Sequence, residues 1–122
     1  MNAAANWMSG IRAPQWALVC RLDDIVPNTG VAALLQEQPI AIFRLADDRV
    51  YAIGNDDPFS RASVLSRGII GDVDGEPVVA SPVYKQHFRL DNGTCIEDPS
   101  IRVPAFRVAV VDGGVIVQLT EK

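Results

Sequence analysis

The stretch that decides the fold is residues 78–90, VVASPVYKQHFRL, which reads as an apolar strand, a Ser-Pro loop and a second strand. An earlier segment, VYAIGNDDPF at residues 50–59, follows a similar plan and ends in an Asp-Pro loop. Short blocks of β-branched and aromatic residues bounded by Asn, Asp or Pro are typical of β-strands. We therefore expect a fold of short strands whose ends carry polar loops.

The rest of the chain continues this pattern of short apolar blocks between turn residues. It predicts strands at residues 16–21, 39–46, 49–54, 77–81, 86–90, 106–111 and 115–119. Tight turns are expected at residues 47–48, 92–93 and 112–114, where Asp, Asn and Gly tolerate positive φ. With 8 prolines and 9 glycines, helix is expected only as single turns near residues 23–25 and 62–67.

Length and composition suit one small globular domain. A chain of 122 residues, 48% hydrophobic, is large enough to bury a core without disulfides or metals. The strand spacing favours a mainly all-β fold, a small antiparallel β-sandwich or barrel with one or two short helical turns. Residues 1–14 show no periodicity and are expected to form a flexible N-terminal segment, with the domain at residues 15–122.

Charge and hydropathy exclude several classes of partner. A net charge of −4, from 11 basic and 15 acidic residues, argues against a nucleic-acid binder, which needs a basic face. Apolar stretches are too short to span a membrane, and the N-terminus lacks the apolar region of a secretory signal. We expect a cytoplasmic protein in which Cys20 and Cys95 are reduced thiols, a disulfide between them being the minor alternative.

The residues do not supply a complete catalytic or metal-binding set. One histidine, His87, and two distant cysteines fall short of a zinc or iron site. A serine nucleophile would need His87 as its base, and no serine lies in an elbow motif, so a hydrolase remains a minor alternative. Adjacent carboxylates occur at turn-like positions, where Asp bonds to backbone: Asp23-Asp24, Asp47-Asp48, Asp56-Asp57 and Glu97-Asp98. No catalytic centre is expected on this chain.

The two loops resemble those of a Rieske domain. That domain places Cys-Pro-His in a first loop and Cys-Pro-x-His in a second, and the two Cys and two His hold a two-iron cluster. Here residues 57–59 read Asp-Pro-Phe and residues 81–84 read Ser-Pro-Val-Tyr, followed by a Phe and an Asn-Gly turn as in that family. The resemblance maps the ligand positions to Asp57, Phe59, Ser81 and Tyr84. All four are changed, so no cluster is expected here.

Three strings make the resemblance narrower: IGNDDPF at residues 53–59, SVLSRG at 63–68 and SPVYKQHFRL at 81–90. Over about residues 15–120 the chain resembles the small subunit of assimilatory NAD(P)H-dependent nitrite reductase. In that family the small subunit is Rieske-like without cluster ligands, and the large subunit carries FAD, an iron–sulfur cluster and siroheme and reduces nitrite to ammonia. The resemblance implies a non-catalytic chain that supports or orients the large subunit.

The resemblance also implies that the loop tips contact the large subunit, because aromatic residues and Arg are enriched at binding hot spots. The expected contact residues are Pro58, Phe59, Arg61, Val83, Tyr84, Lys85 and His87. One alternative is that Phe59 and Tyr84 only fill the space left by the cluster. Two other functions stay open: a Rieske-like scaffold of another oxidoreductase, and a ferredoxin-type electron carrier, which the missing ligands disfavour.

Overall fold

The computed structural model describes residues 15–122, so the segment expected to be flexible, residues 1–14, lies outside the described part. The strands are β1 (Trp16–Arg21), β2 (Thr29–Leu35), β3 (Gln38–Arg44), β4 (Val50–Gly54), β5 (Ile69–Val73), β6 (Glu76–Ala80), β7 (His87–Arg89), β8 (Ala105–Val111) and β9 (Gly114–Glu121). Within the described residues, two single-turn 3₁₀ helices accompany the strands, η2 (Leu22–Asp24) and η3 (Leu65–Arg67). The predicted all-β fold with short helical turns is confirmed.

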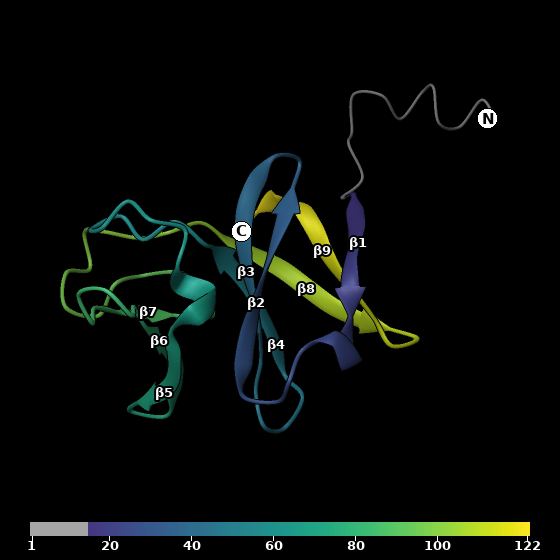
Figure 1. Cartoon of the computed structure of the whole chain (residues 1–122), viewed down its shortest axis with the longest axis horizontal. Coiled ribbons are helices and arrows are strands. Elements are labelled where there is room, and N and C mark those ends of the chain that lie inside the picture. Colours follow the sequence, from purple (N-terminus) through teal and green to yellow (C-terminus); the bar gives the residue numbers. More distant parts are fainter. Residues whose placement is uncertain (1–14) are drawn as a thin grey trace.

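The strands form two antiparallel sheets. A six-stranded sheet has the order β1-β9-β8-β4-β3-β2, and a three-stranded sheet has the order β5-β6-β7. The large sheet curls until its edge strands β1 and β2 touch, and the small sheet lies beside it, joined by long loops (Figure 1). Within residues 15–122, no helix is long and apolar enough to cross a membrane.

Strand β3 lies between two hydrophobic cores. Ile40 and Ile42 face the interior of the curled sheet, which we call the barrel core. Ala41 and Phe43 point the other way and pack with η3 and the small sheet in the inter-sheet core. Because successive strand residues face opposite sides, a strand covered on both faces needs an unbroken apolar run, and residues 40–43 supply it.

Most local predictions agree with the structure, and two strands were missed. The predicted hairpins at residues 47–48 and 112–114 join β3 to β4 and β8 to β9. Strands β2 and β5 were not predicted. Strand β2 (TGVAALL) is rich in small residues of weak strand preference, and Gly71 and Asp72 interrupt the apolar pattern of β5. Pairing with β3 and β6 overrides these local preferences.

The two cysteines are free, as predicted. Cys20 packs against the barrel core and Cys95 is buried in the inter-sheet core, so the thiols belong to different parts of the fold. Burial raises the pKa of both thiols, and the Asp24 carboxylate adds to this for Cys20. Neither cysteine is therefore activated as a nucleophile.

Two turn glycines share a positive φ but differ in whether a Cβ would meet a neighbouring atom, so together they distinguish backbone strain from steric overlap. Gly93 and Gly75 both have positive φ, +78° and +83°, but a Cβ on Gly93 would lie 2.0 Å from the carbonyl oxygen of Val103, whereas nothing lies within 4 Å of one on Gly75. We expect Gly75→Ala to cost about 1–2 kcal/mol of unfolding free energy. Gly93→Ala should cost about 1–3 kcal/mol more, because residues 92–94 must move away from Val103. Urea denaturation measures both, and equal losses would contradict the overlap.

Candidate functional site

The Asp-Pro and Ser-Pro loops meet through a buried hydrogen bond. The first loop, residues 57–62, follows β4 of the large sheet, and the second, residues 81–86, follows β6 of the small sheet. The Ser81 hydroxyl donates to Asp57 Oδ2 at 2.5 Å, and both residues are fully buried. Together the loops form what we call the tip. One bond between side chains thus ties the two sheets together at the tip.

The backbone of the first loop is closed by three hydrogen bonds that start or end at Asp57. Its N–H donates to the Ala62 carbonyl at 2.9 Å, and the Arg61 N–H donates to its carbonyl at 2.7 Å. The Phe59 N–H donates to Asp57 Oδ1 at 2.8 Å. Both carboxylate oxygens of this buried residue are therefore satisfied, as buried polar atoms need to be.

The second loop repeats this pattern around Ser81. Its N–H donates to the Gln86 carbonyl at 2.8 Å, the Lys85 N–H donates to its carbonyl at 3.1 Å, and the Val83 N–H donates to its Oγ at 3.3 Å. The fifth residue of each loop has left-handed backbone, with φ of +63° at Arg61 and +69° at Lys85. The tip is therefore two copies of one six-residue turn, joined at their first residues.

The donor set at the tip does not fit a two-iron cluster. A Rieske two-iron cluster is held by two thiolates and two imidazoles. Asp57 and Ser81, at the thiolate positions of the resemblance, are bonded to each other, and Phe59 has no donor atom. In the part of the chain that the structure describes, no group of three or more His, Cys, Asp or Glu side chains could hold a metal ion.

The two aromatic residues of the tip behave differently. Phe59 packs on the core ring of Phe88, with centroids 6.2 Å apart and planes tilted by 51°, yet 36% of its surface stays exposed. Tyr84 is 61% exposed and Val83 is 43% exposed. Phe59 therefore packs partly into the interior, whereas most of the surface of Tyr84 faces outward.

His87 begins β7 and is engaged by a carboxylate. Its Nδ1 lies 2.5 Å from Glu97 Oε2, and its backbone N–H donates to Glu97 Oε1 at 2.7 Å. Partial burial pushes the pKa of Glu97 upward, but the hydrogen bonds from His87 outweigh it and the pKa is lowered. The Cys95 thiol contacts Glu97 at 3.7 Å rather than the imidazole, so no nucleophile–base pair forms here.

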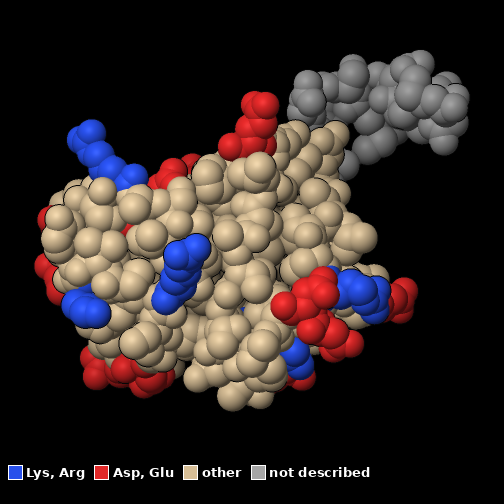
Figure 2. Space-filling model, viewed as in Figure 1, with Lys and Arg blue, Asp and Glu red and all other residues tan. Residues whose placement is uncertain are grey.

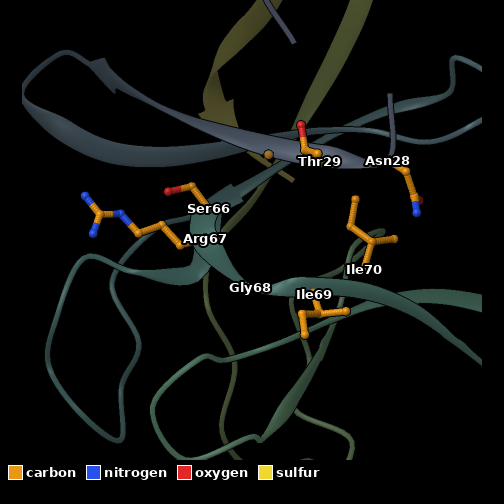
Figure 3. A pocket seen from close by; sticks show the side chains of 8 residues that line it. Asn28, Thr29, Ser66, Arg67, Gly68, Ile69 and Ile70 are labelled. Atoms are coloured by element: carbon orange, nitrogen blue, oxygen red, sulfur yellow. The ribbon is translucent and has the colours of Figure 1, made fainter. Parts of the chain in front are cut away.

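A cleft of about 420 Å³ lies between the start of β2 and the η3–β5 segment. Its lining includes Asn28, Thr29, Ser66, Arg67 and Ile70, and Figure 3 shows that the side chains of Asn28 and Arg67 point to opposite sides. Catalysis needs polar groups that converge on one point. The polar side chains of Asn28 and Arg67 do not converge in this cleft.

Comparison with known proteins agrees with this geometry. Residues 15–118 match the family described as the Rieske-like [2Fe-2S] domain. The chain is 51% identical over 106 residues to the nitrite reductase (NADH) small subunit of Escherichia coli K12, covering 86% of this chain and 96% of the relative. The chain belongs to the nitrite reductase small subunits of the Rieske-like family. The family resemblance seen in the sequence is thereby confirmed.

Two further relatives of this small-subunit family are informative. The NMR structure of the Escherichia coli protein NirD has a TM-score of 0.80 and 48% identity, covering 87% of this chain and 97% of that one. The nitrite reductase [NAD(P)H] large subunit of Klebsiella oxytoca is 43% identical over 112 residues, which are 92% of this chain and 12% of that protein. A domain like this small subunit is thus part of a large-subunit chain in Klebsiella.

Sequence reasoning missed two partners at the site of this small subunit. Asp57 and Ser81 were treated only as lost ligands, and Glu97 was interpreted as a turn residue, although it pairs with His87. The sequence did contain a pattern shared by Asp57 and Ser81. Each of these two residues is followed directly by Pro and, four positions later, by a cation, Arg61 or Lys85. No local pattern announces Glu97, because it lies ten residues from His87 and reaches it only through the fold.

The buried Asp57–Ser81 bond has an exposed counterpart that serves as a matched control. Ser63 donates to Asp56 at the surface of the same region. Ser81→Ala should cost about 1–3 kcal/mol of unfolding free energy, because it leaves a buried carboxylate oxygen without its donor. Ser63→Ala should change stability by less than about 0.5 kcal/mol. Denaturant unfolding of both variants tests this. Similar losses of unfolding free energy would show that the buried bond contributes no more to stability than the exposed one.

The Glu97–His87 pair predicts a loss of stability in acid. The Glu97 carboxyl has a folded-state pKa below its ordinary value of 4.5, so its contribution is full above that pH and disappears as pH falls through the folded pKa. Glu97→Gln should therefore be less stable than the parent at pH 6, and the difference should shrink below pH of about 4.5. Thermal melts across pH 3–7 measure it. A difference independent of pH would contradict the pairing.

Proposed function

We propose that this chain is the small subunit of a cytoplasmic assimilatory NAD(P)H nitrite reductase, which reduces nitrite to ammonia. In this proposal the chain supports or orients the large subunit and performs no chemistry itself. The observation that carries it is the tip, where Asp57 and Ser81 bind each other in place of a cluster. The close small-subunit relatives fix which reductase is meant.

The reaction itself is assigned to the partner. Reduction of nitrite to ammonia needs cofactors that transfer several electrons, which protein side chains do not supply. We place FAD, an iron–sulfur cluster, siroheme and the NAD(P)H site on the large subunit. The Klebsiella relative supports the pairing, since its large subunit contains a domain like this one. A covalent link of that kind raises the effective concentration of the two parts, which favours domains that must associate.

The tip is the proposed contact surface with the large subunit. Its proposed contact residues are Pro58, Phe59, Arg61, Val83, Tyr84 and Lys85, joined by His87, which directly follows the second loop. Tyr84 and Val83 expose large apolar surfaces, and exposed apolar groups in a preformed loop bind at low entropic cost. The exposed ring of Tyr84, which does not contribute to the core, is the best anchor for a partner pocket.

Two other functions have weaker support. A scaffold for a different oxidoreductase would use the same tip, but the small-subunit relatives point to nitrite reductase. A ferredoxin-type carrier needs cluster ligands that the four tip positions do not supply. Restoring Cys and His at these positions would also require breaking the Asp57–Ser81 bond.

The test is co-expression with the large subunit, followed by co-purification and nitrite-dependent NAD(P)H oxidation with and without this chain. We expect a stable complex and faster or longer-lived turnover when the chain is present. Failure to co-purify, together with equal turnover without it, would end the proposal.

A pair of variants locates the contact. Tyr84→Ala should weaken the complex about tenfold or more, as loss of a hot-spot aromatic does, while stability changes by less than about 0.5 kcal/mol. Leu18→Ala, on the exposed face of β1, is the control and should bind normally. Equal binding by Tyr84→Ala and the parent would remove the tip from the interface.

A further inference from the structure

The charge of the tip is opposite to that of the whole chain. The chain carries −4, yet the only charged side chains in residues 57–62 and 81–86 are Asp57, Arg61 and Lys85. Asp57 is fully buried, whereas Arg61 and Lys85 are exposed. Arg61 and Lys85 are therefore the exposed charges of the two loops, while the neighbouring carboxylates of Asp56 and Glu97 are bonded to Ser63 and His87.

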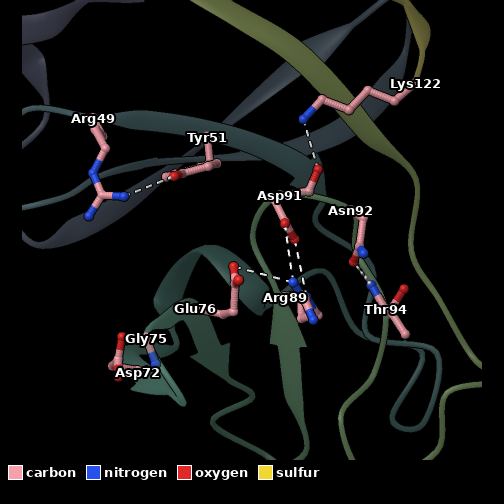
Figure 4. A network of polar contacts seen from close by, with 10 residues as sticks. All are labelled: Arg49, Tyr51, Asp72, Gly75, Glu76, Arg89, Asp91, Asn92, Thr94 and Lys122. Atoms are coloured by element: carbon pink, nitrogen blue, oxygen red, sulfur yellow. Dashed lines mark hydrogen bonds and ion pairs between the residues drawn. The ribbon is translucent and has the colours of Figure 1, made fainter.

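These two cations have no carboxylate partner in the described chain. Ion pairs within residues 15–122 involve Arg44, Arg49, His87 and Arg89. Arg89, by contrast, is held between Glu76 and Asp91 at 3.2 and 3.3 Å (Figure 4). Arg61 and Lys85 thus keep their full charge available to a partner.

The opposite end of the small sheet is acidic. The β5–β6 hairpin carries Asp72 near the end of β5, Asp74 in the turn and Glu76, which pairs with Arg89, at the start of β6. Strand β6 ends at the second loop. Acidic side chains gather at the lower left of Figure 2, where Figure 1 places the β5–β6 turn. Five strand residues span about 17 Å, about twice the screening length of 8 Å at physiological salt. The two ends of β6 therefore present separate fields of opposite sign to a partner.

The backbone holds the two cations at corresponding positions. Arg61 and Lys85 are each the fifth residue of the repeated turn, and each has left-handed backbone, which costs a residue with a Cβ about 1–2 kcal/mol. Gly, Asn or Asp would occupy such positions more easily.

We propose that the tip binds an acidic surface of the large subunit, in which carboxylates surround an apolar pocket. Phe59, Val83 and Tyr84 fill the pocket, and Arg61 and Lys85 pair with the carboxylates. The acidic β5–β6 turn is repelled by the same surface, so the field orients the domain with its tip toward the partner before contact. This rests on the proposed function, because it names the chemistry of the surface that the large subunit presents.

The experiment measures association rates with immobilised large subunit at about 50 mM and 300 mM salt. The parent, Arg61→Gln, Lys85→Gln, the double variant and a control, Arg107→Gln, are compared. Arg107 lies on β8, outside both loops, and its substitution removes the same charge. Thermal melts establish that each variant is folded. Steered association slows about tenfold or more when the charges that guide it are removed.

We expect the double variant to associate about tenfold more slowly at low salt and to lose most of the salt dependence, with Arg107→Gln within about twofold of the parent. If the double variant associates as fast as the parent with the same salt dependence, the proposal of an acidic partner surface is wrong, whereas the proposed subunit function is unaffected. If the parent binds at neither salt concentration, the proposed function fails, and the acidic surface with it. Equal slowing by Arg107→Gln would show that net charge acts rather than the tip, and would also overturn the proposal.

Discussion

Burial of β3 on both faces is the constraint on which the rest of the structure depends. Ile42 packs in the barrel core while its neighbour Phe43 packs between the sheets, so a slip of one residue would exchange the two cores. Gly30 enforces the fit, because a Cβ there would lie 2.7 Å from the Phe43 ring and 2.8 Å from the Ser66 carbonyl. The close approach of Gly30 in β2 to Ser66 in η3 places η3 directly against the large sheet. The first loop, which runs between β4 and η3, takes its position from this contact.

The tip combines loops from two separate sheets, and this explains why its internal bonds matter. In a Rieske domain metal–ligand bonds join the loops. Here each loop closes on its own first residue, and those residues, Asp57 and Ser81, bind each other. The side chains released from ligation are free to face outward, as Tyr84 does. The frame that holds a redox centre in a Rieske domain is thus closed here by bonds between protein groups.

The sequence predicts the parts of this fold that depend on local chemistry. The hairpin turns were foreseeable, since Asp48 and Gly113 occupy positive-φ positions that Asp and Gly tolerate. Strand β2 was not, because its small residues become a strand only through pairing with β3. The loop frame was found through family resemblance. The bond from Ser81 to Asp57, 24 residues away, and the Glu97–His87 pair depend on how the sheets pack, which no local pattern contains.

The hydrogen-bonded tip also changes what the cell must provide for this domain to mature. Every contact that closes the two loops comes from the polypeptide: backbone groups, one carboxylate and one hydroxyl. Loops closed in this way take their shape from contacts among the chain's own groups as the chain folds. The hydrogen bond between the Ser81 hydroxyl and the Asp57 carboxylate does not change with oxidation or reduction, so the shape of the tip does not depend on a redox state. Under the proposed division of cofactors, iron scarcity would limit the large subunit while this chain still folded.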